Sequence, residues 1–271
     1  MLPPEILLLI FGFLESEPFE LISCCTAHPF FAQIIEPALY RNVVVHNMPP
    51  TNSGGAIFRN EEDGFRLSPP ELSHILSNSP HVVRYLHGLT IELFNSLDSD
   101  TTRHISSILH KLRPSCIILS GMNPWGPLDW NDFPVQFARV FVGSISNLHT
   151  REVSIVSVSS VPPSTFRNCK GLRSLKLYHG STSSIELQQA SPIPDYPLLE
   201  HLEINRWHSD QPSVLISWLK PRIINLRSLT LKTPDFDEPI WRRNNLQVSD
   251  LLPICPKTLV ELDIDFHSGM S

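Results

Sequence analysis

Leucine and isoleucine recur along this chain at one fixed spacing, Leu-x-x-Leu-x-Leu/Ile. Five segments carry the spacing, at residues 86–91, 172–177, 199–204, 226–231 and 259–264, and two weaker copies lie at 116–119 and 153–156. The alternation of apolar and polar residues that ends each copy is typical of a strand that buries one face. The last apolar residues of three copies, Leu177, Ile204 and Leu231, are 27 residues apart. The spacing therefore predicts a series of short strands built from one repeating unit.

Segments that suit helices lie between the predicted strands. Ser68-Pro69-Pro70-Glu71 is a capping box with proline inside the first turn, and it predicts a helix that ends near Asn78. Residues 101–112 and 135–146 each place apolar side chains on one stripe at helical spacing. A strand, a loop and a helix in turn predict an α/β fold, with a parallel sheet whose units bury their apolar residues only against neighbours. Shorter helices over 214–220 and 247–254 and a first strand over 42–46 complete the predicted set.

The N-terminal stretch follows a different pattern. Residues 4–14 suit a helix, because Pro3 and Pro4 fit the first turn and Glu5 complements the positive end of the helix dipole. This helix would be apolar on nearly every side, so it needs a partner. Five or six docked side chains, at roughly 1.5–3 kcal/mol each, would hold a tight complex after the costs of association. Two further short helices are expected over 19–25 and 30–36.

The order of these elements resembles an F-box, the module by which SCF-type ubiquitin ligases bind their adaptor. The family opens with Leu-Pro-x-Glu-apolar, continues with three short helices and closes on Leu-aromatic. The positions that match are Leu2, Pro3, Glu5, Ile6, Leu7, Ile10, Leu14, Leu21, Cys24, Leu39 and Tyr40. The third helix departs from the family, with His28-Pro29-Phe30-Phe31 in place of a basic residue and Trp, and Tyr40 stands where Trp is usual.

The resemblance implies an adaptor-binding surface and a Skp-type adaptor that leads to a cullin ligase. The residues that would contact the adaptor are Leu2, Pro3, Ile6, Leu7, Ile10, Leu14, Leu21 and Cys24.

Two other interpretations of the N-terminal stretch are open. The apolar run from Ile6 to Leu14 has the length of a signal-peptide core, although no Lys or Arg precedes it and no small-x-small site follows. Nine apolar residues are too few to span a bilayer, which needs about 20. The alternative is an ordinary cap helix, which would bury the Leu2–Leu14 face against Val43–Val45 rather than leave it open for a partner.

The repeated spacing resembles that of irregular leucine-rich repeats in fungal-type F-box proteins, since such repeats recur at roughly 20–29 residues. The resemblance implies an F-box over residues 1–46, a linker or mobile loop over 47–66, and a leucine-rich-repeat solenoid over 67–271. Strands would line its concave side and helices its convex side. The implied function is that of a non-catalytic substrate-recognition subunit of an SCF-type ubiquitin ligase. The alternatives are a leucine-rich-repeat scaffold with no ubiquitin role and, more distantly, a hydrolase with unrecognised residues.

Net charge, cysteine number and the absence of known catalytic motifs exclude several classes of function. A net charge of −6 argues against a nucleic-acid surface, which needs a basic patch. Five cysteines, an odd number, indicate reduced thiols in the cytoplasm or nucleus rather than a disulfide framework. Phosphate-loop, dinucleotide, zinc-protease and Cys-x-x-Cys motifs are missing, and the twelve histidines are scattered singly. We therefore expect no cofactor, no metal and no membrane contact.

Polar residues between the apolar strand positions predict a recognition surface. Three rows should form across the last four strands: Ser174, His201, Ser228 and Glu261; Lys176, Glu203, Thr230 and Asp263; Tyr178, Asn205, Lys232 and Asp265. The charges could also simply pair between strands, Lys176 with Glu203 and Lys232 with Asp265.

Loops that follow parallel strands leave at one edge, and three of these loops carry tryptophan, which is frequent at interface hot spots. Alternatively, each indole folds back onto its own loop. The candidate target-binding residues are Trp125, Trp130, Tyr178, Trp207, Lys232 and Trp241.

Overall fold

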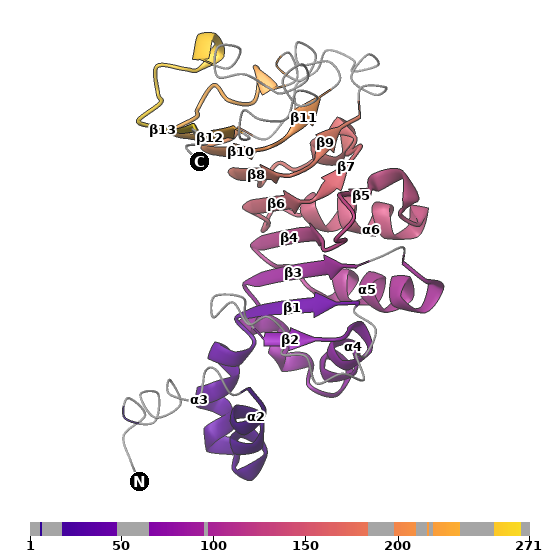
Figure 1. Ribbon diagram of the computed structural model, residues 1–271. Helices are drawn as coiled ribbons and strands as arrows, with labels where there is room; N and C mark the ends of the chain where they lie inside the picture. The colour runs from indigo at the N-terminus through magenta and orange to yellow at the C-terminus, as the bar shows by residue number, and fades with distance from the viewer. Residues whose placement is uncertain are drawn as a thin grey trace, which may run out of the picture.

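The largest feature of the chain is a parallel sheet (Figure 1). The computed structural model describes Ile6 and residues 18–47, 65–94, 97–183, 198–209, 216, 219–233 and 252–266. Among these residues, nine strands form the sheet, and each strand is parallel to its neighbours. In spatial order they are β2 (Phe65–Leu67), β1 (Asn42–His46), β3 (Gly88–Leu93), β4 (Cys116–Gly121), β6 (Glu152–Val156), β8 (Ser174–Tyr178), β10 (His201–Asn205), β12 (Ser228–Thr233) and β13 (Glu261–Phe266).

The strands lie side by side in chain order except at one edge. There β2 pairs with the outer side of β1, and β3 pairs with its inner side. The linker predicted over 47–66 is therefore wrong at its end, because Phe65 and Arg66 belong to β2; residues 48–64 lie outside the described part of the chain. Three residues are too few for an alternating pattern to separate a strand from a loop.

The predicted leucine register is confirmed. Leu175, Leu202 and Leu229 are partners across β8, β10 and β12, and so are Leu177, Ile204 and Leu231. All six are at most 5 % exposed. Because successive side chains of a strand alternate between faces, this register buries one continuous apolar face and turns the polar residues to the other.

Three helices cover the apolar face, in the order of the strands they follow: α4 (Pro69–Asn78), α5 (Ser99–Lys111) and α6 (Val135–Ile145) (Figure 1). Helix α4 packs on α5, and α5 packs on α6. Their buried residues, such as Ile105 and Phe141, belong to the same core as the strand leucines. These three helices were predicted to within about two residues at each end. Of the helix predicted over 214–220, the described residues are Ile216 and Leu219, which are helical, and Lys220, which lies in a turn. Of the helix predicted over 247–254, the described part is the 3-10 turn η5 (Leu252–Ile254).

Two helices lie at the β2 end of the sheet: α2 (Pro18–Ala27) and α3 (Pro29–Leu39) (Figure 1). They pack on each other, and the side chain of His28 caps α3 by accepting a hydrogen bond from the Phe30 N–H at 3.1 Å. Leu21, Ile35 and Leu39 are buried within the core that continues under the sheet. The second and third helices of the predicted N-terminal stretch are thus present.

Short elements complete the described chain. Four two-residue strands follow main strands and pair in parallel, β5 (Leu128–Asp129) with β7 (Val158–Ser159) and β9 (Ser181–Thr182) with β11 (His208–Ser209). The remaining 3-10 turns are η1 (Pro80–Tyr85), η2 (Trp130–Asp132) and η3 (Pro163–Phe166).

Candidate functional site

The face of the sheet opposite the helices is polar over strands β6 to β13. We call this surface the polar face. The register aligns Lys176, Glu203 and Thr230 in one row and Tyr178, Asn205 and Lys232 in the next, so the predicted rows are confirmed. The polar face consists of Glu152, Ser174, Lys176, Tyr178, His201, Glu203, Asn205, Ser228, Thr230, Lys232, Glu261 and Asp263.

Acidic and basic side chains alternate along the polar face, but not in the predicted pairs. The Lys176 Nζ lies 2.7 Å from Glu152 Oε1, and the Lys232 Nζ lies 3.7 Å from Glu203 Oε1. The prediction that Lys176 pairs with Glu203 is wrong, because Lys176 reaches diagonally back to β6. The predicted partner of Lys232, Asp265, has a side chain outside the described set. Each lysine therefore pairs with the strand before its own.

Tyr178 joins this array through Glu203. Burial, a hydrogen bond to the Glu203 carboxylate and the charge of that carboxylate raise the pKa of Tyr178 above its ordinary value. For Lys176, burial alone lowers the pKa, but the hydrogen bond and charge of Glu152 outweigh burial and raise it. Both groups are protonated at neutral pH, so Tyr178 is a neutral phenol and Lys176 carries a charge paired with Glu152.

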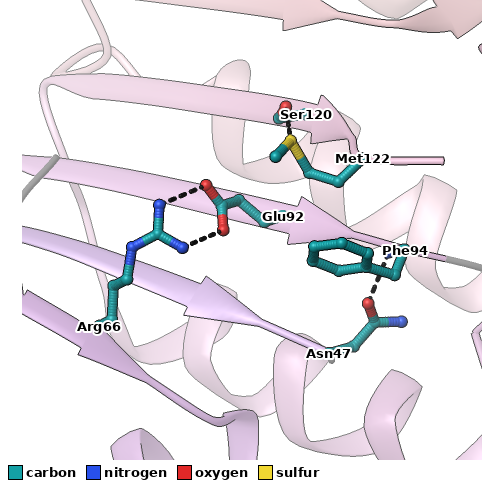
Figure 2. Close-up of polar contacts among 6 residues, drawn as sticks. All are labelled: Asn47, Arg66, Glu92, Phe94, Ser120 and Met122. Carbon is teal, nitrogen blue, oxygen red and sulfur yellow. Dashed lines mark hydrogen bonds and ion pairs between the residues drawn. The ribbon is translucent and has the colours of Figure 1, made fainter. Parts of the chain in front are cut away.

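At the other end of the sheet the polar side chains are more enclosed (Figure 2). Arg66 of β2 donates two hydrogen bonds to the Glu92 carboxylate of β3, at 2.9 and 3.1 Å, and Glu92 is 6 % exposed. Asn47 Oδ1 accepts a hydrogen bond from the Phe94 N–H at 2.7 Å, which ties the ends of β1 and β3 together. At this end of the sheet the charges of Arg66 and Glu92 neutralise each other, so this ion pair presents little net charge to a partner.

The loops that leave the middle strands begin with one repeated backbone turn. Ser157, His179 and Arg206 directly follow β6, β8 and β10 and have φ angles of 52°, 51° and 48°. Their N–H groups donate to carbonyls at or next to the end of the following strand, of Tyr178, Asn205 and Lys232 respectively. A positive φ is uncommon for residues other than glycine. Its recurrence after three strands shows that the chain makes the same turn at each strand end, so the loops that follow leave at the same edge of the sheet. The sequence carries no glycine signal for this turn.

The tryptophans do not form the shared exposed patch that was predicted. Trp125 is 92 % exposed, but Trp130 is 7 % exposed and Trp207 is 2 % exposed. Trp130 packs edge-on against Phe133 and Phe141, with ring centroids 5.6 and 6.0 Å away. As target anchors, Trp130 and Trp207 were wrong predictions; Trp241 lies outside the described residues.

The burial of Trp207 has a local cause. Its Nε1–H donates to Thr182 Oγ1 at 2.7 Å, and its ring lies over Gly180. A Cβ on Gly180 would lie 2.5 Å from the ring and 2.1 Å from the carbonyl oxygen of Val158. The indole therefore folds back between two loops, with its polar atom satisfied as buried indoles require.

The predicted adaptor-binding residues are described in part. Ile6 is helical and 42 % exposed, Leu21 is 5 % exposed, and Cys24 is half-buried. Leu21 faces the core rather than solvent. The others, Leu2, Pro3, Leu7, Ile10 and Leu14, lie outside the described residues.

Reactive groups are scarce. All five cysteines are free thiols, and burial raises the pKa of Cys25 and Cys116 to about 11 and of Cys169 to about 12. These three are protonated at neutral pH, whereas a thiolate is the nucleophilic form. No cluster of three potential metal ligands occurs in the described ranges. Within the same part of the chain, no helix has the length and apolar character to cross a bilayer.

Comparison with protein-family models, with curated proteins and with solved structures gave no match.

Proposed function

We propose that this chain is the substrate-recognition subunit of an SCF-type ubiquitin ligase. In this proposal residues 1–46 are an F-box that binds a Skp-type adaptor, and the repeated strands are a leucine-rich-repeat solenoid that binds a target protein. The chain acts as a tether that raises the effective concentration of target lysines near a ubiquitin-charged enzyme, without a catalytic residue of its own.

The observation that carries the proposal is the register of the parallel strands. It buries the repeated leucines of β8, β10 and β12 on one side and leaves a polar face several strands wide on the other, while Leu262 of the last strand is 44 % exposed. Side chains there are half-exposed or exposed, as Lys176, Glu203 and His201 are. A regular polar face whose described part has no thiolate and no cluster of three metal ligands suits protein recognition better than covalent chemistry.

The N-terminal helices support the adaptor half of the proposal. Ile6 keeps 42 % of its surface exposed, which is what an unoccupied adaptor contact requires. Helix α3 ends at Leu39, and Tyr40 then packs edge-on against Phe65 with ring centroids 5.7 Å apart. The Leu-aromatic close of the F-box pattern thus anchors the helices to the first strands.

For the target, the proposal retains Trp125, Tyr178 and Lys232. Trp125 is the most exposed large apolar side chain among the described residues. Tyr178 and Lys232 lie in the same row of the polar face. This row is the one at the C-terminal ends of the strands, next to the positions where the loops begin.

The test is co-purification of tagged full-length chain with a Skp-type adaptor. Ile6→Asp, alone and with Ile10→Asp, would place charge in a dry interface at a cost of several kcal/mol when unpaired. Adaptor recovery should be lost while the circular dichroism spectrum is unchanged. The matched control is Val260→Asp, the same substitution at a site that is 87 % exposed at the other end of the sheet, and it should leave recovery intact.

The same pull-down, read by mass spectrometry, tests the target half. Trp125→Ala should lower target recovery by the equivalent of more than about 1 kcal/mol and leave the adaptor bound. Adaptor binding that survives both isoleucine substitutions contradicts the F-box assignment.

A second candidate is a leucine-rich-repeat scaffold whose N-terminal helices only cap the sheet. It is favoured by the burial of Leu21, Ile35 and Leu39 in the core shared with the strands. Under this alternative, no adaptor co-purifies with the unmodified chain, while Trp125→Ala still reduces partner capture.

A further inference from the structure

A groove of about 640 Å³ lies on the helical side of the molecule, away from the polar face. Helix α6 contributes Gln136, Arg139 and Gly143 to it, the last turn of α5 contributes Leu109, and Arg113 follows that helix. The groove is open to solvent along one side. Its base is apolar, since Leu109 and Leu112 are each 3 % exposed.

The charge of the groove is of one sign. Arg113 and Arg139 both line it and are exposed, and no Asp or Glu does. Neither arginine has a hydrogen bond or ion pair with the described residues, whereas Arg66, Arg173 and Lys176 are each paired with a carboxylate. In a chain whose net charge is −6, two guanidinium groups facing one groove form a local positive field.

The basic residues around the groove are not all placed to complement a helix dipole. His110, in the last turn of α5, complements the negative end of that helix. The dipole effect falls off within one turn of a helix end, and Arg139 lies in the middle of α6. Arg139 is exposed on the outer face of α6, so its charge is available to a ligand in the groove.

The walls of the groove are held in place by hydrogen bonds. Ser144 Oγ donates to the Leu109 carbonyl at 3.3 Å, which ties α6 to α5. The buried Thr150 hydroxyl lies 3.1 Å from the Pro114 carbonyl and 3.2 Å from the Ser144 carbonyl. Asn147, which also lines the groove, accepts the His149 N–H with its Oδ1 at 3.1 Å. The backbone that carries the two arginines is thus held in place before a ligand binds, which lowers the ordering cost of the site.

Gly143 leaves the helix backbone open to solvent on the groove side. Glycine is a poor helix former, yet Gly143 lies inside α6. A Cβ built on it would meet no atom within 4 Å, so packing within the chain does not require glycine there. The backbone of α6 is therefore accessible to a ligand at this position.

We propose that this groove binds an organic anion: a phosphate or carboxylate group carried on an apolar body. Arg113 and Arg139 hold the oxyanion, which guanidinium groups bind through paired N–H donors. Val140, which is half-buried, receives the apolar body above the base formed by Leu109 and Leu112. The groove lies on the helical side, so the site is independent of the proposed recognition of a target by the polar face.

The test is an NMR titration of the ¹⁵N-labelled full chain with phenyl phosphate, with phenol as the uncharged probe. Phenyl phosphate should cause saturable shifts around residues 136–147 with an affinity of about millimolar order, and phenol should not. Arg113→Ala with Arg139→Ala should weaken binding about tenfold or more. Arg167→Ala, which removes an exposed arginine outside the groove, should change it by less than about twofold.

Substitutions of Gly143 separate occupancy of the groove from loss of folding. Gly143→Ala should leave binding within about twofold, whereas Gly143→Glu should abolish it while the spectrum elsewhere is unchanged, because it places a carboxylate beside the arginines. An acetylated phosphoserine amide distinguishes the source of the group: tighter binding than phenyl phosphate supports a phosphorylated polypeptide, and weaker binding supports a free small molecule. Absence of saturation, or equal affinity in the double arginine variant, overturns the proposal.

Discussion

At the scale of single residues, position in the strand decides whether a side chain is buried in the core or lies on the polar face. Leu202 is 2 % exposed and has leucine partners on both neighbouring strands. The next residue, Glu203, faces the other way and contacts Lys232 and Tyr178. Two adjacent residues therefore belong to different layers with different energetics.

The first prediction compares these two residues. Leu202→Ala should lower the free energy of unfolding by about 2–5 kcal/mol, since it leaves a cavity in a packed core. Glu203→Gln keeps the shape of the side chain and removes only a partly exposed ion pair, so it should cost under about 1 kcal/mol. Urea denaturation of both variants measures the difference. Equal losses would mean that the two side chains do not lie on opposite faces.

At the scale of elements, helix starts were the features that local sequence predicted best. The capping box that opens α4 is present, with the Ser68 N–H donating to Glu71 Oε2 at 2.7 Å and the Ser68 hydroxyl at 2.6 Å from the same oxygen. Hydrogen bonds from the Ser68 side chain and backbone hold the pKa of Glu71 below its ordinary value. These contacts need only residues three apart, which explains why the pattern could be recognised.

This cap gives a pH-dependent prediction. Because the folded pKa of Glu71 is lowered, its contribution to stability is present above the unfolded pKa, near 4.3, and is lost as pH falls through the folded pKa. Glu71→Gln should therefore be less stable than the parent by about 0.3–1 kcal/mol at neutral pH. The gap should close below about pH 4, measured by urea unfolding at several pH values. A gap that persists in acid would show that the carboxylate charge is not the source.

Elements that depend on distant contacts were predicted less well. The sequence predicts a linker where β2 begins, because its three residues form a strand only through their pairing with β1. Trp130 and Trp207 were taken for surface anchors because loop position alone does not show that Phe141 and Gly180 receive the rings. Lys176 was assigned to Glu203 because the register gives rows but not the diagonal reach of a lysine to Glu152. The repeated spacing thus predicted the sheet and its two faces, while the positions of these side chains needed the three-dimensional structure.

At the scale of the whole molecule, one core connects the N-terminal helices to the far strands. Buried residues from Leu21 in α2 to Leu231 in β12 belong to a single cluster. The ion pair of Arg66 with Glu92 joins β2 to β3 (Figure 2). The edge contact of Tyr40 with Phe65 joins the end of α3 to β2. Repeated units that contact only their neighbours fold cooperatively when the contacts between units are strong. A continuous core of this kind indicates one unfolding unit rather than a separate helical module.

The last prediction tests this coupling. Leu39→Ala, in α3, and Leu229→Ala, in β12, lie near opposite ends of the described core, and each should cost about 2–5 kcal/mol. Cys169 lies between them and is fully buried, so its thiol should react with a labelling reagent only when the core opens. In a chain whose other four cysteines are replaced by serine, both substitutions should move the urea midpoint of Cys169 labelling together with the midpoint from circular dichroism. If Leu39→Ala instead produces an early transition and leaves the Cys169 midpoint in place, helices α2 and α3 unfold as a unit of their own. The shared core would then not couple them to the sheet.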